Sequence, residues 1–276
     1  MKKIFALCLI VYLFYLFIFN NQLIEDLSQI NQMFFQRYLI SLLPFIFFTN
    51  LFLKTNILID IHKFCTKNKL LFFFNFTIIL LTILIGIPSN INLLAYLEKS
   101  GMITQKQKSN LINCLGGISF PFMFLVILKN NPIKYLIIFI ILGVEIFLYF
   151  YSNNKSELKE VKYTPYRVNL IESIIKSLTT ILTSLIIFSS FNFLFAKFDT
   201  PFSLFIRGLI EFSYNSILLA NIEAKSANLF LLIILSFTSL SLIFQIKLLD
   251  SNFNISEYIK KRAIIALLSS LFFLLI

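Results

Sequence analysis

Two polar interruptions divide stretches of sequence that are otherwise apolar enough to cross a lipid bilayer. The first is Gly86-Ile87-Pro88-Ser89-Asn90, and the second runs from Asn113 through Gly116-Gly117 and Ser119 to Pro121. Glycine and proline leave backbone groups without helical partners, and an unpaired amide in hydrocarbon costs several kcal/mol. Such breaks persist only where protein or a polar cavity satisfies the backbone. We therefore expect helices arranged around these two interruptions.

The composition indicates an integral membrane protein. Of the 276 residues, 58% are hydrophobic and 13% are charged, and the mean hydropathy is +0.87. Soluble domains have about 45–50% apolar and about 25% charged residues. A chain of this length holds about six to nine crossings of about 20 residues each. The expected fold class is therefore an all-α polytopic membrane protein in contact with the lipid bilayer.

The net charge of +11 is spread over many short loops. We interpret it as a topology signal and as contact with lipid headgroups. No basic stretch lies outside a loop that flanks a membrane segment, so binding to nucleic acid is not expected.

The residue types that most catalytic and metal sites need are sparse. The three cysteines are scattered without CxxC spacing, and the one histidine, His62, sits beside Lys63 near a membrane boundary. We find no HExxH motif and no phosphate-binding glycine loop. The sequence therefore predicts no enzyme activity, no metal site and no cofactor.

The N-terminal region predicts one helix and an external segment. Lys2-Lys3 precede the apolar run Ile4–Phe19, which we interpret as an uncleaved transmembrane helix over residues 1–20 with a cytoplasmic N-terminus. Residues 20–36 contain acidic residues but no Lys or Arg, as expected outside the cell. A helix from Phe35 to Leu53 follows, and Pro44 should kink it.

The run from Leu70 to Ile87 leads into the first interruption, and residues 91–98 then form a short amphipathic helix. Thr104 with Gln107 has the spacing of a capping box, which predicts the start of a helix that ends at Gly116-Gly117. The chain resumes as a helix from Phe122 to Leu128.

A further span is predicted from Ile133 to Tyr151. It contains Glu145, which we expect to lie close enough to the helix end to reach water. The polar stretch 152–166 then serves as a connector, which divides a first half, residues 21–151, from a second half, residues 167–276.

The second half opens with a polar stripe at helical spacing. Its members recur every three or four residues on a helix that continues to Ala196, and they are Asn169, Ser173, Ser177, Thr180 and Ser184. In a membrane such a stripe should face protein or a cavity. Hydrogen bonding between helices is the simpler of these two interpretations.

The next segment begins at Thr200-Pro201, with proline at a first-turn position. Arg207 and Glu211 are four residues apart, so we expect them to share a helix face, where they can pair. The pair is either a functional site or a structural ion pair at the membrane edge. The run from Ala227 to Leu249 is interrupted at Ser236–Ser241, and a last span follows Lys260-Lys261-Arg262.

The two halves follow the same order of long helix, glycine-containing polar motif, interrupted helix and final span. Paired broken segments in corresponding positions indicate a transporter site at a repeat interface. We expect two related halves with broken or re-entrant helices. The predicted substrate-binding residues are Gly86, Pro88, Ser89, Asn90, Asn113, Gly116, Gly117, Ser119, Arg207, Glu211, Asn215, Ser239 and Gln245.

Five motifs, in this order, carry a resemblance to a known family. They are Ser41-Leu42-Leu43-Pro44-Phe45-Ile46, Gly86-Ile87-Pro88-Ser89, Leu97-Glu98-Lys99-Ser100-Gly101-Met102-Ile103-Thr104, Gly208-Leu209-Ile210-Glu211, and Ser241 to Gln245. From about residue 22 to its end, the chain resembles the YlbJ-type sporulation integral membrane proteins of the nucleoside-recognition, or Gate, domain group. Asn90 stands where that family has a small residue or glycine, and the polar patch before Pro121 is looser than the family's form.

The resemblance implies passage of a small anionic metabolite, dipicolinate, across the cell membrane or the membrane around the forespore. Related Gate proteins include nucleoside carriers, so a nucleoside is the alternative substrate. A non-transport scaffold of a sporulation or envelope complex is a second alternative, and an intramembrane enzyme is a third. The substrate, the coupling ion, a homo-oligomeric state and the re-entrant character of residues 70–98 and 200–222 stay open.

Overall fold

The structure is a computed structural model that describes residues 39–55, 57–124, 132–152, 169–192 and 200–276, and four single residues before them. Every regular element in these ranges is a helix: α3 (Leu39–Thr55), α4 (Ile57–Lys67), α5 (Leu71–Ile85), α6 (Ser89–Lys99), α7 (Gln105–Leu115), α8 (Phe120–Phe122), α9 (Pro132–Ser152), α10 (Leu170–Asn192), α11 (Pro201–Ile210), α12 (Phe212–Ala220), α13 (Lys225–Phe237), α14 (Leu240–Leu249) and α15 (Ile255–Leu275). The predicted helix at 1–20 and the connector after Ser152 lie outside the described residues.

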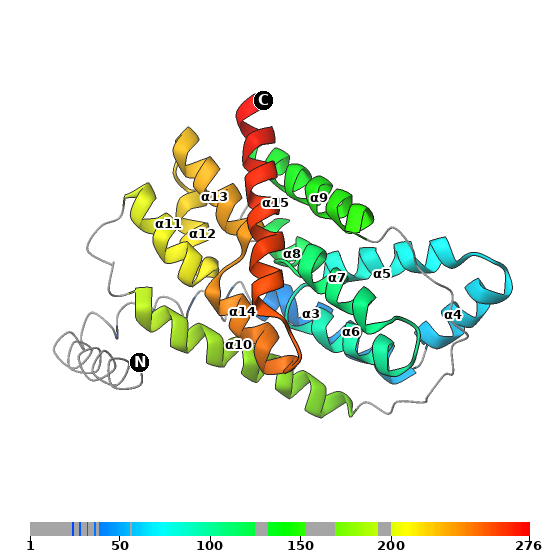
Figure 1. Cartoon of the computed structure of the whole chain (residues 1–276). Helices are drawn as coiled ribbons and strands as arrows, with labels where there is room; N and C mark the ends of the chain where they lie inside the picture. Colours follow the sequence, from blue (N-terminus) through cyan, green and yellow to red (C-terminus); the bar gives the residue numbers. More distant parts are fainter. Residues whose placement is uncertain are drawn as a thin grey trace.

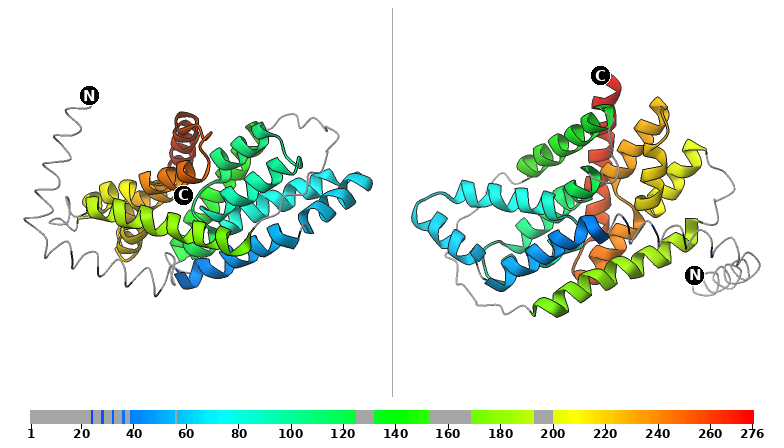
Figure 2. Two further views of the ribbon diagram at one scale, coloured as in Figure 1. Left: turned by 90° about the horizontal axis from the view of Figure 1, so that it is seen from below. Right: turned by 180° about the vertical axis from the view of Figure 1, so that it is seen from behind.

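The last helix, α15, runs through the middle of the molecule (Figure 1) and packs on α13, α9 and α7. Helices α11 to α13 lie on one side of it, and α5 to α9 lie on the other. Helix α10 lies along one edge (Figures 1 and 2), where it contacts α3, α11 and α14. The C-terminal helix therefore joins the two sequence halves.

The local helix signals of the sequence appear at the expected residues. The Thr104 hydroxyl accepts from the Gln107 amide at 3.2 Å, and the Gln107 side chain accepts from the Thr104 amide at 2.8 Å. This confirms the predicted capping box. Thr200 caps α11 by accepting from the Ser203 amide at 3.2 Å, with Pro201 in the first turn.

The polar stripe of α10 faces protein in its later part, whereas Asn169, just before the helix, is exposed. Ser177 and Ser184 are buried, and each meets another helix. Asn92 on α6 donates to the Ser177 hydroxyl at 3.1 Å, and Gln245 on α14 donates to the Ser184 hydroxyl at 2.7 Å. The stripe therefore ties α10 to both sequence halves.

Two helical stretches among the described residues are long and apolar enough to span a membrane. They are Ile133–Ser152, with a mean hydropathy of 2.3, and Lys225–Leu249, with a mean hydropathy of 2.4. A third is obtained if the pair Leu42–Thr55 and Ile57–Lys67, bent by 63°, forms one span. The all-helical class is thus confirmed for the part described, and the larger number of crossings stays a prediction.

Large apolar side chains are exposed along several helices. On α5, Phe72 is 75% exposed, and Phe73 and Phe76 are exposed beside it. On α9, Phe139 and Phe147 are exposed in the same way. Monomeric soluble proteins rarely show apolar surfaces of this extent, so the described surface is compatible with a membrane protein.

An ion-pair network ties the α6–α7 turn to the end of α14. The Lys108 ammonium lies 2.9 Å from the Glu98 carboxylate and 2.7 Å from the Asp250 carboxylate. Burial disfavours the charged lysine, but hydrogen bonds and charge from Asp250 and Glu98 outweigh it and raise the pKa of Lys108 above its usual 10.5. The network is therefore fully formed at neutral pH.

We expect Lys108→Met to reduce the loss of folding stability that the wild type shows at high pH. A raised folded-state pKa stabilises the fold fully below pH 10.5, and this contribution is lost as the pH rises through the higher folded value. The free energy of unfolding of the wild type should fall above pH 10.5, and that of the variant should fall less. Lys106→Met, on the exposed side of α7, is the control, and it should keep the wild-type profile.

Gly86 cannot carry a side chain. Its φ of 65° and ψ of 174° lie in a region that is essentially restricted to glycine. A Cβ atom there would lie 2.6 Å from the Ser119 backbone nitrogen. The glycine therefore allows the end of α5 to approach the start of α8.

We expect Gly86→Ala to lower the free energy of unfolding by at least about 2 kcal/mol, from backbone strain and overpacking together. Gly143→Ala on α9 is the matched control, because a Cβ there meets no atom within 4 Å. Alanine in a helix is favoured over glycine by about 1 kcal/mol, so the control should be equal to or more stable than the wild type. Equal melting of the two variants in detergent would contradict this account.

Candidate functional site

Four helix breaks lie in the described chain, and we number them along the sequence. Break 1 is Gly86–Pro88, break 2 is Gly116–Ser119, break 3 is Glu211, and break 4 is Thr238–Ser239. The sequence predicted interruptions at breaks 1, 2 and 4, and at break 3 it predicted a polar motif on a helix that continues through Glu211. What it left open was how these breaks lie relative to one another.

Breaks 1 and 2 are in direct contact through Gly86 and Ser119. Ser119 also caps the short helix α8, since its hydroxyl accepts from the Phe122 amide at 3.4 Å. Gly116 ends α7, with its amide donating to the Ile112 carbonyl at 2.9 Å. The two motifs that interrupt the first half therefore form one polar junction.

Break 4 repeats the backbone geometry of Gly86 with a different residue. Thr238 has φ 69° and ψ 176°, and its amide donates to the Ile234 carbonyl at 2.9 Å. A β-branched residue in this region costs about 1–3 kcal/mol. Ser239 then caps α14 by accepting from the Leu242 amide at 3.4 Å. The sequence offered no sign of strain at this threonine.

Tyr258 on α15 joins break 2 to break 4. Its hydroxyl donates to the Gly116 carbonyl at 2.8 Å and lies 3.0 Å from the Thr238 hydroxyl. All of the Tyr258 side chain is buried. One hydroxyl therefore holds a break from each sequence half.

Arg262, one turn after Tyr258, forms a buried ion pair with Glu145 on α9. Arg262 is 0% exposed and Glu145 is 4% exposed. The prediction that Glu145 reaches water is therefore wrong, because α9 packs against α15 and turns this carboxylate inward. Sequence reasoning also read Arg262 as a flanking charge. Glu145 is the one acidic residue of the apolar helix α9, which is the signal that it needs a buried cationic partner.

Glu211 caps α12 instead of pairing with Arg207. Its carboxylate accepts from the Ser213 and Tyr214 amides at 2.9 and 3.2 Å and from the Ser213 hydroxyl. Helix α11 ends at Ile210, so Glu211 is extended. The ion pairs among the described residues do not join Arg207 to Glu211, and the predicted pair is wrong for this reason.

A small cavity of about 30 Å³ brings breaks 1 and 3 together. Ile87 and Glu211 line it, with Ser184 and Gln245 from α10 and α14. This volume is large enough to hold a water molecule. Gln245, predicted at the site from sequence, is therefore placed beside Glu211, with its amide on Ser184.

The remaining predicted site residues are all buried. Asn215 donates to the Glu211 carbonyl at 2.9 Å, and Asn113 donates to the Ser109 hydroxyl at 3.3 Å. By contrast, neither the Ser89 hydroxyl nor either polar atom of the Asn90 side chain has a hydrogen-bond partner among the described residues. Both residues are in the first turn of α6, directly after break 1.

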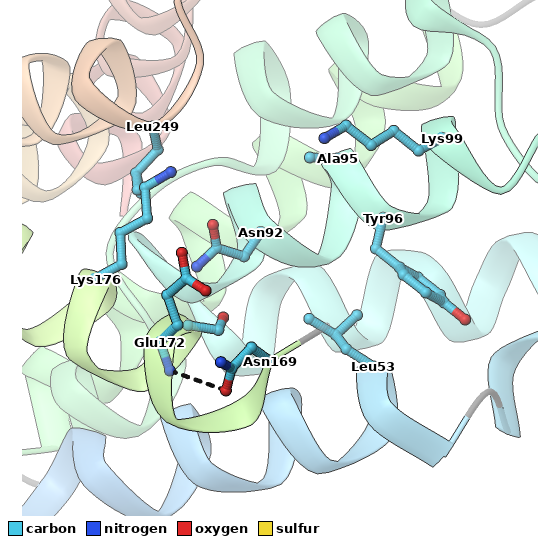
Figure 3. A pocket seen from close by; sticks show the side chains of 10 residues that line it. Leu53, Asn92, Ala95, Tyr96, Lys99, Asn169, Glu172, Lys176 and Leu249 are labelled. Atoms are coloured by element: carbon cyan, nitrogen blue, oxygen red, sulfur yellow. Dashed lines mark hydrogen bonds between the residues drawn. The ribbon is translucent and has the colours of Figure 1, made fainter. Parts of the chain in front are cut away.

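A larger pocket, of about 280 Å³, lies between α6 and α10 (Figure 3). Its lining includes Asn92, Lys99, Glu172 and Lys176, and both lysines are exposed. Sequence reasoning did not identify this pocket, although Asn169 and Ser173 of the predicted stripe line it.

Within the described ranges, no group of three or more His, Cys, Asp or Glu residues could hold a metal ion. Comparisons with family models, with curated proteins and with solved structures find no match to this chain. The function is therefore argued from the residues and their geometry.

We expect Tyr258→Phe to lower the free energy of unfolding by about 1–3 kcal/mol, because it leaves the buried Gly116 carbonyl and Thr238 hydroxyl without this partner. Tyr151→Phe, at a side chain 70% exposed on α9, is the control and should change stability by less than about 0.5 kcal/mol. Chemical unfolding in detergent measures both. A Tyr258 variant as stable as the control would show that the breaks are held by packing alone.

Proposed function

We propose that the chain is a multi-pass membrane transporter of a small anionic metabolite, which binds between the broken helices. The observation that carries this proposal is the side-chain amide of Asn90, which is buried beside break 1 and has no hydrogen-bond partner in the described chain. The resemblance in the sequence suggests dipicolinate as the substrate, and a nucleoside is the alternative.

The unpaired polar atoms of α6 favour a ligand over simple packing. Asn90 is 0% exposed, and its donor and acceptor both lack a partner in the part of the chain described. A buried amide without hydrogen bonds costs about 1–3 kcal/mol by protein mutational measures. Native folds rarely keep such a group without a role for it. A polar solute with a donor and an acceptor would satisfy both atoms.

The charge at this position favours an anion. Asn90 lies in the first turn of α6, an eleven-residue helix, and helix N-termini carry partial positive charge. No acidic residue occurs in that first turn. The solute that suits this environment carries a carboxylate or a similar group.

Two observations support a location in a membrane. Several helices expose large apolar side chains, and two stretches are long and apolar enough to span a bilayer. Broken helices are tolerated at membrane depth where protein or a polar cavity satisfies the backbone. In each half, two breaks flank a tight turn: breaks 1 and 2 around the turn after α6, and breaks 3 and 4 around the turn after α12. This order supports the two related halves and the alternating access expected of transporters.

We expect Asn90→Leu to abolish transport without weakening the fold. Removal of the unpaired amide should leave the free energy of unfolding equal or higher by about 1 kcal/mol. Uptake of labelled dipicolinate or of a labelled nucleoside into proteoliposomes should fall at least tenfold at equal protein content.

Asn68→Leu, at an exposed asparagine that bonds within its own helix end, is the matched control and should keep wild-type uptake. A scaffold predicts a different result, because its polar residues only pack helices. In that case the wild-type protein takes up neither solute, and the proposed function fails.

A further inference from the structure

One nitrogen of the Arg262 guanidinium group makes hydrogen bonds to the protein. Its Nη1 donates to the Glu145 carboxylate and lies 3.4 Å from the Ser236 carbonyl oxygen next to break 4. The guanidinium carbon is 5.5 Å from the centre of the Tyr258 ring. These contacts fix the plane and the orientation of the group.

The other edge of Arg262 is buried and unpaired in the described part of the chain. Its Nε and Nη2 atoms are buried and have no hydrogen-bond partner among the residues that the structure describes. These two nitrogens carry parallel N–H groups on one edge of the planar group, the geometry that binds both oxygens of a carboxylate. An arginine buried in this way is expected to have its donors satisfied.

Gly117 lies against this edge and has no side chain to press on it. A Cβ atom at that position would lie 2.6 Å from Nη2 of Arg262 and 3.1 Å from the Glu145 carboxylate. Its φ is not in the left-handed region, so backbone conformation does not require glycine here. Glycine is required at this position because the guanidinium group of Arg262 approaches so closely.

The Ser236 hydroxyl adds a second unpaired group. It is buried and without a partner in the described chain, on the residue whose carbonyl meets Arg262. The unpaired edge of Arg262 thus presents two charged N–H donors, and the Ser236 hydroxyl belongs to the residue whose carbonyl meets Nη1. Donors in this number favour an anion over a cation.

We infer that the unpaired Nε–Nη2 edge of Arg262, above Gly117, binds a carboxylate group of the transported solute. This inference rests on the proposed function and names the residue that recognises the anion. Because both donors are sealed from solvent, the solute reaches them when break 2 moves away from α15. Glu145 holds Nη1 throughout, so binding does not require the ion pair to open.

The test measures thermal stabilisation of the purified full chain by pyridine-2,6-dicarboxylate, with the neutral pyridine-2,6-dicarboxamide as a ligand of the same shape. The wild type should be stabilised by the dicarboxylate and not by the diamide. Arg262→Lys keeps the charge but loses the planar edge, and Gly117→Ala places a methyl group against that edge. Both should weaken the dicarboxylate at least tenfold.

Lys261→Gln removes the neighbouring cation, which donates to the Ser152 hydroxyl, and should bind the dicarboxylate as the wild type does. Gly117→Ala alters only contacts with side-chain ends, so it keeps the test valid if Arg262→Lys does not fold. Unchanged dicarboxylate binding by the Gly117 variant overturns the inference, and so does equal stabilisation of the wild type by the diamide.

Proteoliposome uptake separates the two proposals. If the wild type takes up the dicarboxylate and Gly117→Ala takes it up at the same rate, the role of Arg262 is overturned and the proposed function stays intact. A second result overturns the proposed function but supports the binding site. In it, the wild type binds the dicarboxylate, Gly117→Ala does not, and the wild type transports nothing.

Discussion

One tyrosine hydroxyl on α15 holds together two helix breaks that come from different halves of the chain. Tyr258 donates to the Gly116 carbonyl and meets the Thr238 hydroxyl, and both partners sit where a helix has lost its own backbone bonds. Unsatisfied backbone groups in a buried setting destabilise a fold by several kcal/mol. The last helix therefore supplies what the broken helices lack, and the arrangement of the breaks depends on it.

Sequence reasoning located the breaks because their signals are local. The Thr104–Gln107 capping box, the Thr200 cap and the interruptions at Gly86 and Gly116 each follow from a few neighbouring residues. The same reasoning could not say which breaks meet. Contact between Gly86 and Ser119 depends on the packing of α5 against α8, and no short-range pattern encodes it.

The charged residues show where sequence rules point the wrong way. Spacing of four residues predicted that Arg207 pairs with Glu211, but the helix ends between them, and Glu211 caps α12 instead. Position near a helix end predicted that Glu145 reaches water, but α15 covers it with Arg262. In both cases a neighbour that is distant in sequence, or a change of backbone direction, decides the partner.

The difference between satisfied and unsatisfied polar groups separates two kinds of buried residue in this fold. Tyr258 and Glu211 have their side-chain oxygens bonded to protein, and the Gln245 amide nitrogen donates to Ser184, so loss of these side chains should lower the stability of the fold. Asn90 and one edge of Arg262 have buried polar atoms that are unpaired among the described residues, so they cost stability in the structure as it stands. Groups of the second kind persist when a function needs them, because selection for stability alone would replace them. A solute that bonds to them would stabilise the protein when it binds.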